Sequence, residues 1–271
     1  MSREPEIRPI PSEDVGEDKR FLKLKHHEIL FQPPFTCATI GSIGTGKSSF
    51  AYSLVNDLYS NYFDEVVVLC STVDSKSSWE NVKQKRVVFL DQYDETSFHT
   101  YIKQLEEDQE ARKKKGKFPI RVLLVMDDIV FENFNKNKSG VLERLMMTCR
   151  HYFVSILLML QHSKQISPAM RNQIMFWVLF RLTTNDLKKV SSEHGNLLTN
   201  DEFEHMYHDV QQKGKYEFLI INYKKPMNER FSHRFTQTID QSKYTSRVDA
   251  SSHQPTTRLS SLAPNTGVSH V

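Results

Sequence analysis

Residues 41–48 read GSIGTGKS and match the pattern G-x-x-x-x-G-K-[ST] at every fixed position. An apolar stretch, FTCATI (35–40), precedes them, and an amphipathic stretch, SSFAYSLVNDLY (48–59), follows. A buried strand, a glycine-rich loop and a helix in that order are the context in which this pattern binds phosphate, which a chance glycine-rich turn would lack. The segment therefore predicts a phosphate-binding loop at the end of a strand.

Each residue type in this loop has a chemical task. Glycines let successive backbone N–H groups curl toward the β-phosphate of a nucleotide, and the positive end of the following helix attracts the same anion. We expect Lys47 to bridge the β- and γ-phosphate oxygens and the Ser48 hydroxyl to bind Mg²⁺. The predicted cofactors are therefore ATP and Mg²⁺. The predicted nucleotide-binding residues are Gly41, Ser42, Ile43, Gly44, Thr45, Gly46, Lys47, Ser48 and Ser49.

Outward from the loop, short apolar runs alternate with longer amphipathic segments, which is typical of parallel strands joined by crossover helices. Several of the runs are continuous Val, Leu and Ile, which suits strands covered on both faces. We therefore expect an α/β fold with a mostly parallel central sheet and helices on both faces. The expected strands span 35–40, 65–70, 86–90, 121–126, 153–160, 174–182 and 216–222, and the expected helices span 46–59, 95–115, 139–151, 185–193 and 200–213, the last capped by Asn200.

The two ends of the chain differ from this core in composition. Residues 1–20 mix Pro, Glu and Arg, and residues 241–271 are rich in Ser, Thr and Pro, so we expect a flexible arm, a domain over 21–240 and a disordered tail. The three cysteines fit neither a zinc knuckle nor a secreted disulfide framework. No apolar run is long enough to span a membrane, so a soluble, unprocessed chain is expected. The net charge of +3 by itself argues for no polyanionic partner.

Hydrolysis needs an acid that holds the metal and a group that orients water. The run VLLVMDD (122–128) carries two acids to the end of a buried strand, which is where ligands of open α/β sheets bind. We expect Asp127 to coordinate Mg²⁺ through water and Asp128 to act as the catalytic base. Many ATPases with an extra strand between the two motifs have Glu in place of Asp128, whose side chain is one methylene shorter.

A third buried run, FVSILLML (153–160), delivers Gln161 to the same edge, where its amide can contact both the attacking water and a phosphate oxygen. Arg150 and Arg171 are candidates for neutralising charge in the transition state, either of them acting across a subunit boundary. Ordinary surface ion pairs are the alternative for both arginines.

Four segments in order, GSIGTGKS (41–48), VLLVMDD (122–128), CRHYFVSILLMLQ (149–161) and SPAMRNQ (167–173), resemble the poxvirus-type DNA-packaging ATPases. These belong to the FtsK/HerA superfamily of P-loop proteins, found in large DNA viruses, virophages and related elements. The resemblance covers about residues 35–222. Its most specific part is the Arg150–His151 pair that leads into a strand ending in Gln161.

This resemblance implies an ATP-driven motor that moves double-stranded DNA into a preformed capsid. It further implies a homo-oligomeric ring of five or six subunits, a capsid portal or vertex protein as partner, and a place in the host cytoplasm, a viral factory or the virion. By motif position, Lys47 and Ser48 carry over as Walker A residues and Asp127 as the Walker B acid. Asp128 carries over as the catalytic acid and Gln161 as the sensor. Arg150 or Arg171 carries over as the arginine that acts on a neighbour.

Other functions remain open from the residues alone. A nucleotide or nucleoside kinase would share the loop but needs a lid with several arginines, and a module that binds nucleotide without efficient hydrolysis is open if Asp128 is incompetent. A GTPase is disfavoured because residues 135–138 (NKNK) lack the Asp that would pair with guanine.

DNA would be held through its phosphates, which are the same in every sequence. Candidate DNA-contacting loops are 71–79 and 133–138, whereas the basic run at 112–117 is interpreted as a solvated helix end. His205 and His208 share a helix face without a nearby third ligand, so no zinc site is assigned. Trp79 is open to two interpretations, a partner contact or the shielding of a local apolar patch.

Overall fold

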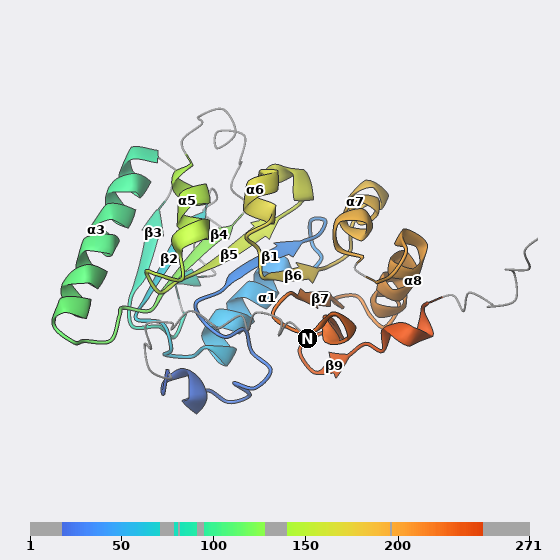
Figure 1. Ribbon diagram of the computed structural model, residues 1–271, viewed down its shortest axis with the longest axis horizontal. Helices are drawn as coiled ribbons and strands as arrows, with labels where there is room; N and C mark the ends of the chain where they lie inside the picture. The colour runs from blue at the N-terminus through green and yellow to red at the C-terminus, as the bar shows by residue number, and fades with distance from the viewer. Residues whose placement is uncertain are drawn as a thin grey trace, which may run out of the picture.

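The protein folds around one large sheet, as a computed structural model of the chain shows (Figure 1). The structure describes residues 18–70, 79–80, 82–90, 95–127, 140–195 and 197–245. Within these residues, nine strands pair in the order β3-β2-β4-β5-β1-β6-β7-β8-β9. The strands are β1 (Thr36–Ile40), β2 (Glu65–Cys70), β3 (Val87–Leu90), β4 (Val122–Asp127), β5 (Val154–Leu160), β6 (Phe176–Leu179), β7 (Leu219–Asn222), β8 (Phe231–His233) and β9 (Gln237–Thr238).

The longer helices match the predicted segments closely, and α6 is additional. They are α1 (Lys47–Ser53), which continues as the π-helical turn η2 (Leu54–Leu58), α3 (Glu95–Lys114), α5 (Val141–Thr148), α6 (Pro168–Arg171), α7 (Thr184–His194) and α8 (Asn200–Gln211). Single turns of 3₁₀ helix occur at η1 (Phe21–Lys23), η3 (Ser163–Gln165), η4 (Met227–Glu229) and η5 (Gln241–Lys243). Within the described ranges, no helix combines the length and apolar character needed to cross a bilayer.

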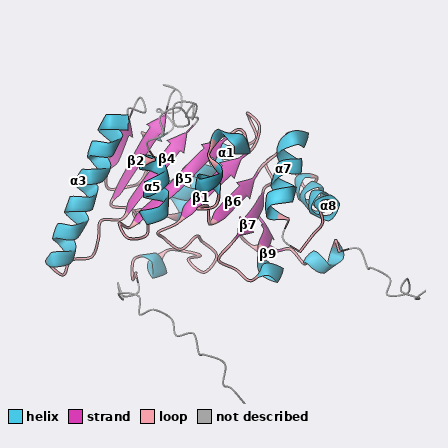
Figure 2. Ribbon diagram, turned by 45° about the horizontal axis from the view of Figure 1, so that its top comes forward, coloured by secondary structure: helices cyan, strands magenta, loops and turns pink. Residues whose placement is uncertain are grey.

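The sheet is mostly parallel, as predicted. Strands β3, β2, β4, β5, β1 and β6 all run in one direction. The predicted strand at 216–222 belongs to the antiparallel part of the sheet, because β7 pairs antiparallel with β6 and is followed by the antiparallel strands β8 and β9. Two helices, α7 and α8, connect β6 to β7 along the chain and lie side by side (Figures 1 and 2). Because the connection has two helices, the chain returns to the edge at which β6 ends, and β7 runs antiparallel to β6.

Alternate residues of the central strands pack into two separate cores, one on each face of the sheet. On one face, Val67 and Leu69 of β2 pack in the core that takes apolar residues from α3, α5, α6, α7 and α8. On the other face, Val66 and Val68 pack in a second core with α1, η2 and the segment before β1. Helices and loops therefore cover both faces of the sheet, which explains why its central strands are continuously apolar.

The start of α8 corrects one predicted detail. Thr199, not Asn200, is the N-cap, since its hydroxyl accepts the backbone N–H of Glu202 at 3.3 Å. The Glu202 carboxylate in turn accepts the backbone N–H of Thr199 at 2.8 Å, which completes a capping box. The sequence therefore places this helix correctly, and the reciprocal bonds decide which residue caps it.

Contacts extend slightly beyond the predicted limits of the domain. Asp18 accepts hydrogen bonds from the Arg121 guanidinium at 2.8 and 2.9 Å, and Arg20 pairs with Asp64 at 2.8 Å. At the other end, the helical turn η5 follows residue 240. The boundaries of the arm and the tail, and the character of both, stay predictions.

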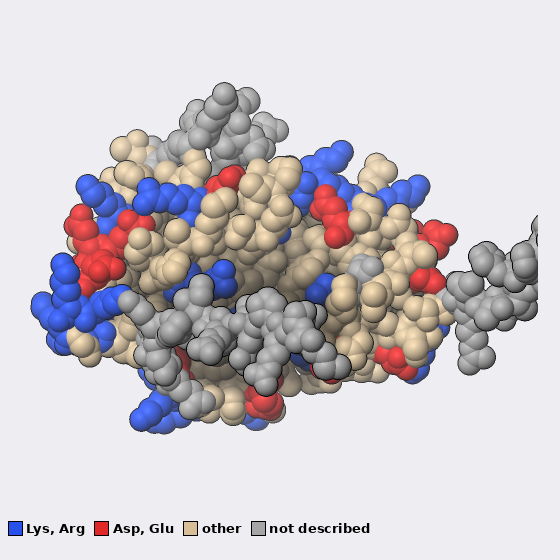
Figure 3. Space-filling model, in the orientation of Figure 1, with Lys and Arg blue, Asp and Glu red and all other residues tan. Residues whose placement is uncertain are grey.

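Three of the lesser sequence signals lie in the described residues. Trp79 is 1% exposed and packs in the core beside α1, so it shields apolar surface. The basic run 112–117 spans the last residues of α3 and the turn that follows, where Lys and Arg side chains gather on the surface (Figure 3). His205 lies 3.8 Å from Asp209 on the same helix, and among the described residues no group of three His, Cys, Asp or Glu side chains could hold a metal ion.

Candidate functional site

The phosphate loop joins β1 directly to α1, as the sequence predicts. Gly44 and Gly46 have φ angles of 73° and 105°, in the left-handed region that side chains disfavour. Gly41 is needed for another reason, since a Cβ there would lie 2.7 Å from the Cβ of Phe180. The backbone N–H of Ser42 donates to the carbonyl of Arg181 at 2.9 Å. The end of β6 therefore fixes the loop from outside the motif.

The polar side chains of the loop lie where the sequence places them. The Lys47 ammonium donates to the carbonyl oxygens of Gly41 and Ser42 at 2.6 and 3.0 Å, so it reaches back across the loop. The Thr45 hydroxyl also donates to Ser42, at 2.8 Å. Ser48 and Ser49 are exposed on the first turn of α1. A cation and two accessible hydroxyls thus surround the backbone turn that would hold phosphate.

Asp127 and Gln161, the predicted acid and amide, lie at the same edge of the sheet as the phosphate loop. Strand β5 lies between β1 and β4, so the three strand ends are adjacent. Asp127 is the last residue of β4 and pairs with Met159 of β5, while the backbone N–H of Gly41 donates to the Leu160 carbonyl at 3.3 Å. Gln161 follows at once. The structure therefore brings Lys47, Asp127 and Gln161 to one edge of three neighbouring strands.

The donor set at this edge fits Mg²⁺, which prefers hard oxygen ligands and usually keeps several waters. Asp127 is 5% exposed, so its carboxylate is shielded from bulk solvent. Strands β4 and β1 are two positions apart, which separates their backbones by about 10 Å. Ser48 and Asp127 are the residues that would hold the ion, which would supply positive charge beside the phosphates. Asp128, the predicted catalytic base, lies outside the described residues.

Gln161 stands at the start of a tightly bonded turn. The Gln165 side-chain oxygen accepts the backbone N–H groups of Gln161 and His162 at 2.6 and 2.9 Å. His162 contacts Asp186 at 2.8 Å, and although burial alone would raise the pKa of that carboxyl, the bonds from His162 and Thr183 hold it below its usual value. The turn that carries the predicted sensor is therefore anchored to α7.

The two candidate arginines do not join this group within the chain. Arg150 precedes β5, and Arg171 precedes β6, so both lie at the amino-terminal edge of the sheet. Strand β5 alone has seven residues, about 20 Å of extended chain, between Arg150 and Gln161. Arg150 can therefore not reach its own phosphate loop, whereas the Arg171 guanidinium is held by Glu193 and by the Ile166 carbonyl. For Arg150, the predicted role across a subunit boundary agrees with this placement and stays a prediction.

Both arginines line a cavity of about 550 Å³ at the amino-terminal edge, called the second cavity below to distinguish it from the one beside the phosphate loop. Lys224, which the sequence did not single out, adds a third cation, and burial together with Arg150 lowers its pKa. Arg171 is 11% exposed, pairs with Glu193 at 3.3 Å and donates to the Ile166 carbonyl at 2.9 Å. Arg150 is exposed. Of the two, Arg150 is the one whose guanidinium is presented to the outside.

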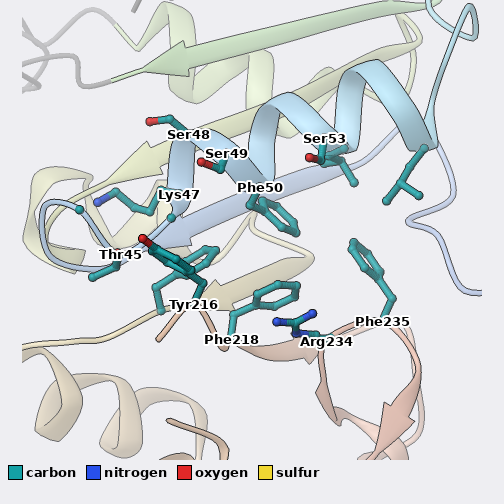
Figure 4. A pocket seen from close by; sticks show the side chains of 15 residues that line it. Thr45, Lys47, Ser48, Ser49, Phe50, Ser53, Tyr216, Phe218, Arg234 and Phe235 are labelled. Carbon is teal, nitrogen blue, oxygen red and sulfur yellow. The ribbon is translucent and has the colours of Figure 1, made fainter. Parts of the chain in front are cut away.

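A further cavity, of about 580 Å³, opens beside the phosphate loop and runs beneath α1 (Figure 4). One wall is residues 44–49, and the opposite wall comes from the segments around β7 and β8. Sequence reasoning missed this second wall, although the aromatic alternation of Tyr216 and Phe218 and the Arg234–Phe235 pair were visible in it. These residues are far from the motif in sequence, and only the antiparallel strands bring them to the loop.

A protein-family comparison matches most of the chain. Residues 22–250 match the family described as the poxvirus A32 protein. The chain belongs to this family. Membership confirms the resemblance to poxvirus-type packaging ATPases. Protein 075L of Invertebrate iridescent virus 6, which is uncharacterised, is 28% identical over 184 residues, or 68% of each chain.

Solved structures share the fold of this family member at low identity. The DNA-packaging ATPase B204 from Sulfolobus turreted icosahedral virus is 16% identical, with a TM-score of 0.53 over 72% of this chain and 95% of B204. The cytoplasmic domain of the type VII secretion ATPase EccC from Thermomonospora curvata is 12% identical, with a TM-score of 0.52 over 75% of this chain and 25% of that domain. Both likenesses confirm the P-loop ATPase fold.

Proposed function

We propose that this protein is the ATP-hydrolysing motor that moves double-stranded DNA into a preformed viral capsid. The observation that carries the proposal is the adjacency of three strand ends, which gathers Lys47, Asp127 and Gln161 beside one phosphate loop. Membership of the poxvirus A32 protein family supports genome packaging by an ATPase. A structure of genome-packaging NTPase B204 from Sulfolobus turreted icosahedral virus 2 contains AMP, which supports nucleotide binding by the shared fold.

In this proposal, different residues of the chain bind the phosphates, the metal ion and the attacking water. The loop N–H groups and Lys47 hold the β- and γ-phosphates, which positions the γ-phosphorus for attack. Ser48 and Asp127 hold Mg²⁺, which supplies neutralisation of the phosphate charge when bound. Gln161 orients the attacking water from its anchored turn. Asp128 follows Asp127 in sequence and is proposed as the base.

The remaining charge is proposed to be neutralised by a neighbouring subunit. Arg150 is exposed at the edge of the sheet opposite the phosphate loop, so a ring in which that edge of one subunit faces the loop of the next would complete each site. Loss of the γ-phosphate would then release the arginine and permit a rigid-body shift between subunits. A ring of five or six subunits is proposed.

The DNA and capsid partners are proposed from the function. A packaging motor must accept every sequence, so contacts with DNA phosphates are expected, and a portal or vertex protein would dock the ring on the capsid. The candidate DNA-contacting residues 71–78 and 133–138 lie outside the described residues. The proposed place of action is the host cytoplasm, a viral factory or the virion. The kinase alternative finds no support in the comparisons.

The deciding experiment measures ATP hydrolysis by the purified full-length protein with and without double-stranded DNA. We expect DNA to stimulate the rate, and Lys47→Ala to reduce it at least about a hundredfold, since the substitution removes a cation that contacts the transferred phosphate. Lys114→Ala, at the exposed end of α3 and outside both cavities, is the matched control and should keep the wild-type rate. A rate that responds to a small phosphate acceptor but not to DNA would refute the motor.

A further inference from the structure

The cavity beneath α1 has the position that the rest of a nucleotide requires. Its rim includes residues 44–49, so it opens directly from the loop proposed to hold the phosphates. Ser49 and Ser53, one turn apart on α1, both line it, and it continues to Leu58 beyond the end of that helix. A volume of about 580 Å³ lies within the range of about 300–1,000 Å³ that is usual for small-molecule pockets.

The chemistry of this cavity suits a flat, uncharged ring better than an anion. The floor consists of packed aromatic side chains: the ring centroids of Phe50 and Phe218 are 5.1 Å apart, and the Phe50 and Phe235 rings stack at 5.9 Å (Figure 4). Phe218 also packs against Phe180 at 5.3 Å. Such mutual packing holds the floor rigid, so a planar ligand would find a preformed apolar surface.

The cation on the far wall is already neutralised. The Arg234 guanidinium donates to both carboxylate oxygens of Glu217, at 2.7 and 2.8 Å, and its centre lies 5.9 Å from the Phe218 ring. An arginine held by two parallel bonds keeps its plane fixed and has little net charge left to attract phosphate. It can still stack on a ring or donate to a ring nitrogen.

Tyr216 stands between this cavity and the phosphate loop. Tyr216 is 50% exposed, and its ring lies against the loop, since a Cβ on Gly46 would come within 3.2 Å of the Tyr216 Cδ1. Lys215 places its ammonium 5.0 Å from the same ring. An exposed aromatic side chain at the junction of a phosphate site and an apolar cleft is well placed to stack on a base.

We propose that the cleft lined by Tyr216, Phe218 and Arg234 is the nucleobase site, and that Tyr216 is the residue on which the base stacks. The proposal rests on the proposed function for the identity of the ligand as a nucleoside triphosphate. It assigns a binding task to the antiparallel end of the sheet, where β7 and β8 meet α1. Phosphate binding and base binding would thus come from separate parts of the chain.

The test compares two ligands that differ by the nucleoside. Binding of the non-hydrolysable analogue AMP-PNP and of inorganic tripolyphosphate, both with Mg²⁺, is measured by calorimetry on the full-length protein. We expect Tyr216→Ala to weaken AMP-PNP binding about tenfold and to leave tripolyphosphate binding within about twofold of wild type, because only the stacking contact is lost. Tyr216→Phe should bind AMP-PNP like wild type. Lys47→Ala should weaken both ligands.

Leu197→Ala is the matched control, since Leu197 is 60% exposed and lies away from the cleft on the turn before α8; it should change neither ligand. Photolabelling with 8-azido-ATP gives a second measurement, in which the label should fall on the peptide around Tyr216 or around Arg234. Unchanged AMP-PNP binding by Tyr216→Ala, an equal loss of tripolyphosphate, or labelling confined to other peptides would overturn the proposal. If the selective loss is found but DNA does not stimulate hydrolysis, the base site stands and the motor fails.

Discussion

The two edges of the parallel sheet carry different kinds of cation. At the carboxyl-terminal edge, Lys47 lies inside a glycine loop and donates to that loop's own carbonyl oxygens. At the amino-terminal edge, Arg171 is tied to Glu193, and Arg150 is exposed at the mouth of a cavity. One edge therefore has a complete cradle for phosphate, whereas the other has charge without a phosphate-binding loop.

A single copy of the chain therefore holds only part of the hydrolytic machinery we propose. About 20 Å of strand separates Arg150 from Gln161, and no side chain is long enough to cover that distance. The loop edge should therefore govern nucleotide binding by each subunit. The arginine edge should govern the rate only where a neighbour presents its loop.

The largest expected effect comes from two variants, each of which carries a substitution at only one of the two edges. Arg150→Ala should lower ATP hydrolysis by about a thousandfold while leaving AMP-PNP binding intact, as removal of an arginine acting in trans does. Mixing equal amounts of Arg150→Ala and Lys47→Ala protein should restore activity at about a quarter of the interfaces, where an intact loop meets an intact arginine. Steady-state rates of the mixture and of each variant alone measure this.

The controls for this prediction separate catalysis from folding. Arg144→Ala, also exposed and carried on α5, should keep the wild-type rate. Arg171→Ala should instead lower the melting temperature, because it leaves the partly buried Glu193 without its arginine. A mixture no more active than its components would show that the two edges do not meet across a subunit boundary.

An intermediate effect is expected at the glycines of the carboxyl-terminal edge. Gly46→Ala combines a φ of 105° with a Cβ only 3.2 Å from Tyr216, so the loop must distort. We expect nucleotide affinity to fall at least about thirtyfold, together with a stability loss of about 1 kcal/mol. Calorimetric titration and urea denaturation measure the two effects.

Gly116→Ala is the matched comparison for that substitution. Gly116 also has a positive φ, 62°, but a Cβ there meets nothing within 4 Å. It should lose a similar stability of about 1 kcal/mol and keep full nucleotide affinity. Equal affinities for the two variants would mean that the geometry at Gly46 plays no part in binding.

The smallest effect concerns the amino-terminal edge and pH. His194 lines the second cavity, and burial, followed by the Arg171 charge, lowers its pKa to about 4. Because the unfolded chain takes up this proton near pH 6.5 and the folded protein only near 4, the free energy of unfolding should fall as pH drops through that window. His194→Phe should reduce the loss between pH 7.5 and pH 5 by about 2 kcal/mol.

Urea denaturation at the two pH values measures this difference. His205→Phe, on the exposed side of α8, is the control and should lose as much stability as the wild type. Nucleotide binding at pH 7.5 should be the same in both variants, since the histidines lie away from the phosphate loop. A wild-type pH response in His194→Phe would contradict a neutral, buried imidazole at this position.

Local sequence signals predicted the carboxyl-terminal edge well. Each strand there is a continuous apolar run that ends in a polar residue, and parallel strands bring such ends together, so the convergence of Asp127 and Gln161 with the loop followed from pattern alone. The capping residue of α8 and the direction of β7 could not be predicted from these local patterns. Both depend on bonds with partners that the local pattern does not name.

The sequence by itself determined the phosphate loop, the α/β class, the family and the set of polar residues at the strand ends, because each is encoded in contiguous residues with a fixed period. Only the tertiary structure decided that Arg150 lies at the sheet edge opposite its own loop and that Tyr216 and Phe218 line a cleft beside that loop. The physical reason is distance along the chain: α7 and α8 lie between β6 and β7, and their packing on the sheet determines where the last strands return.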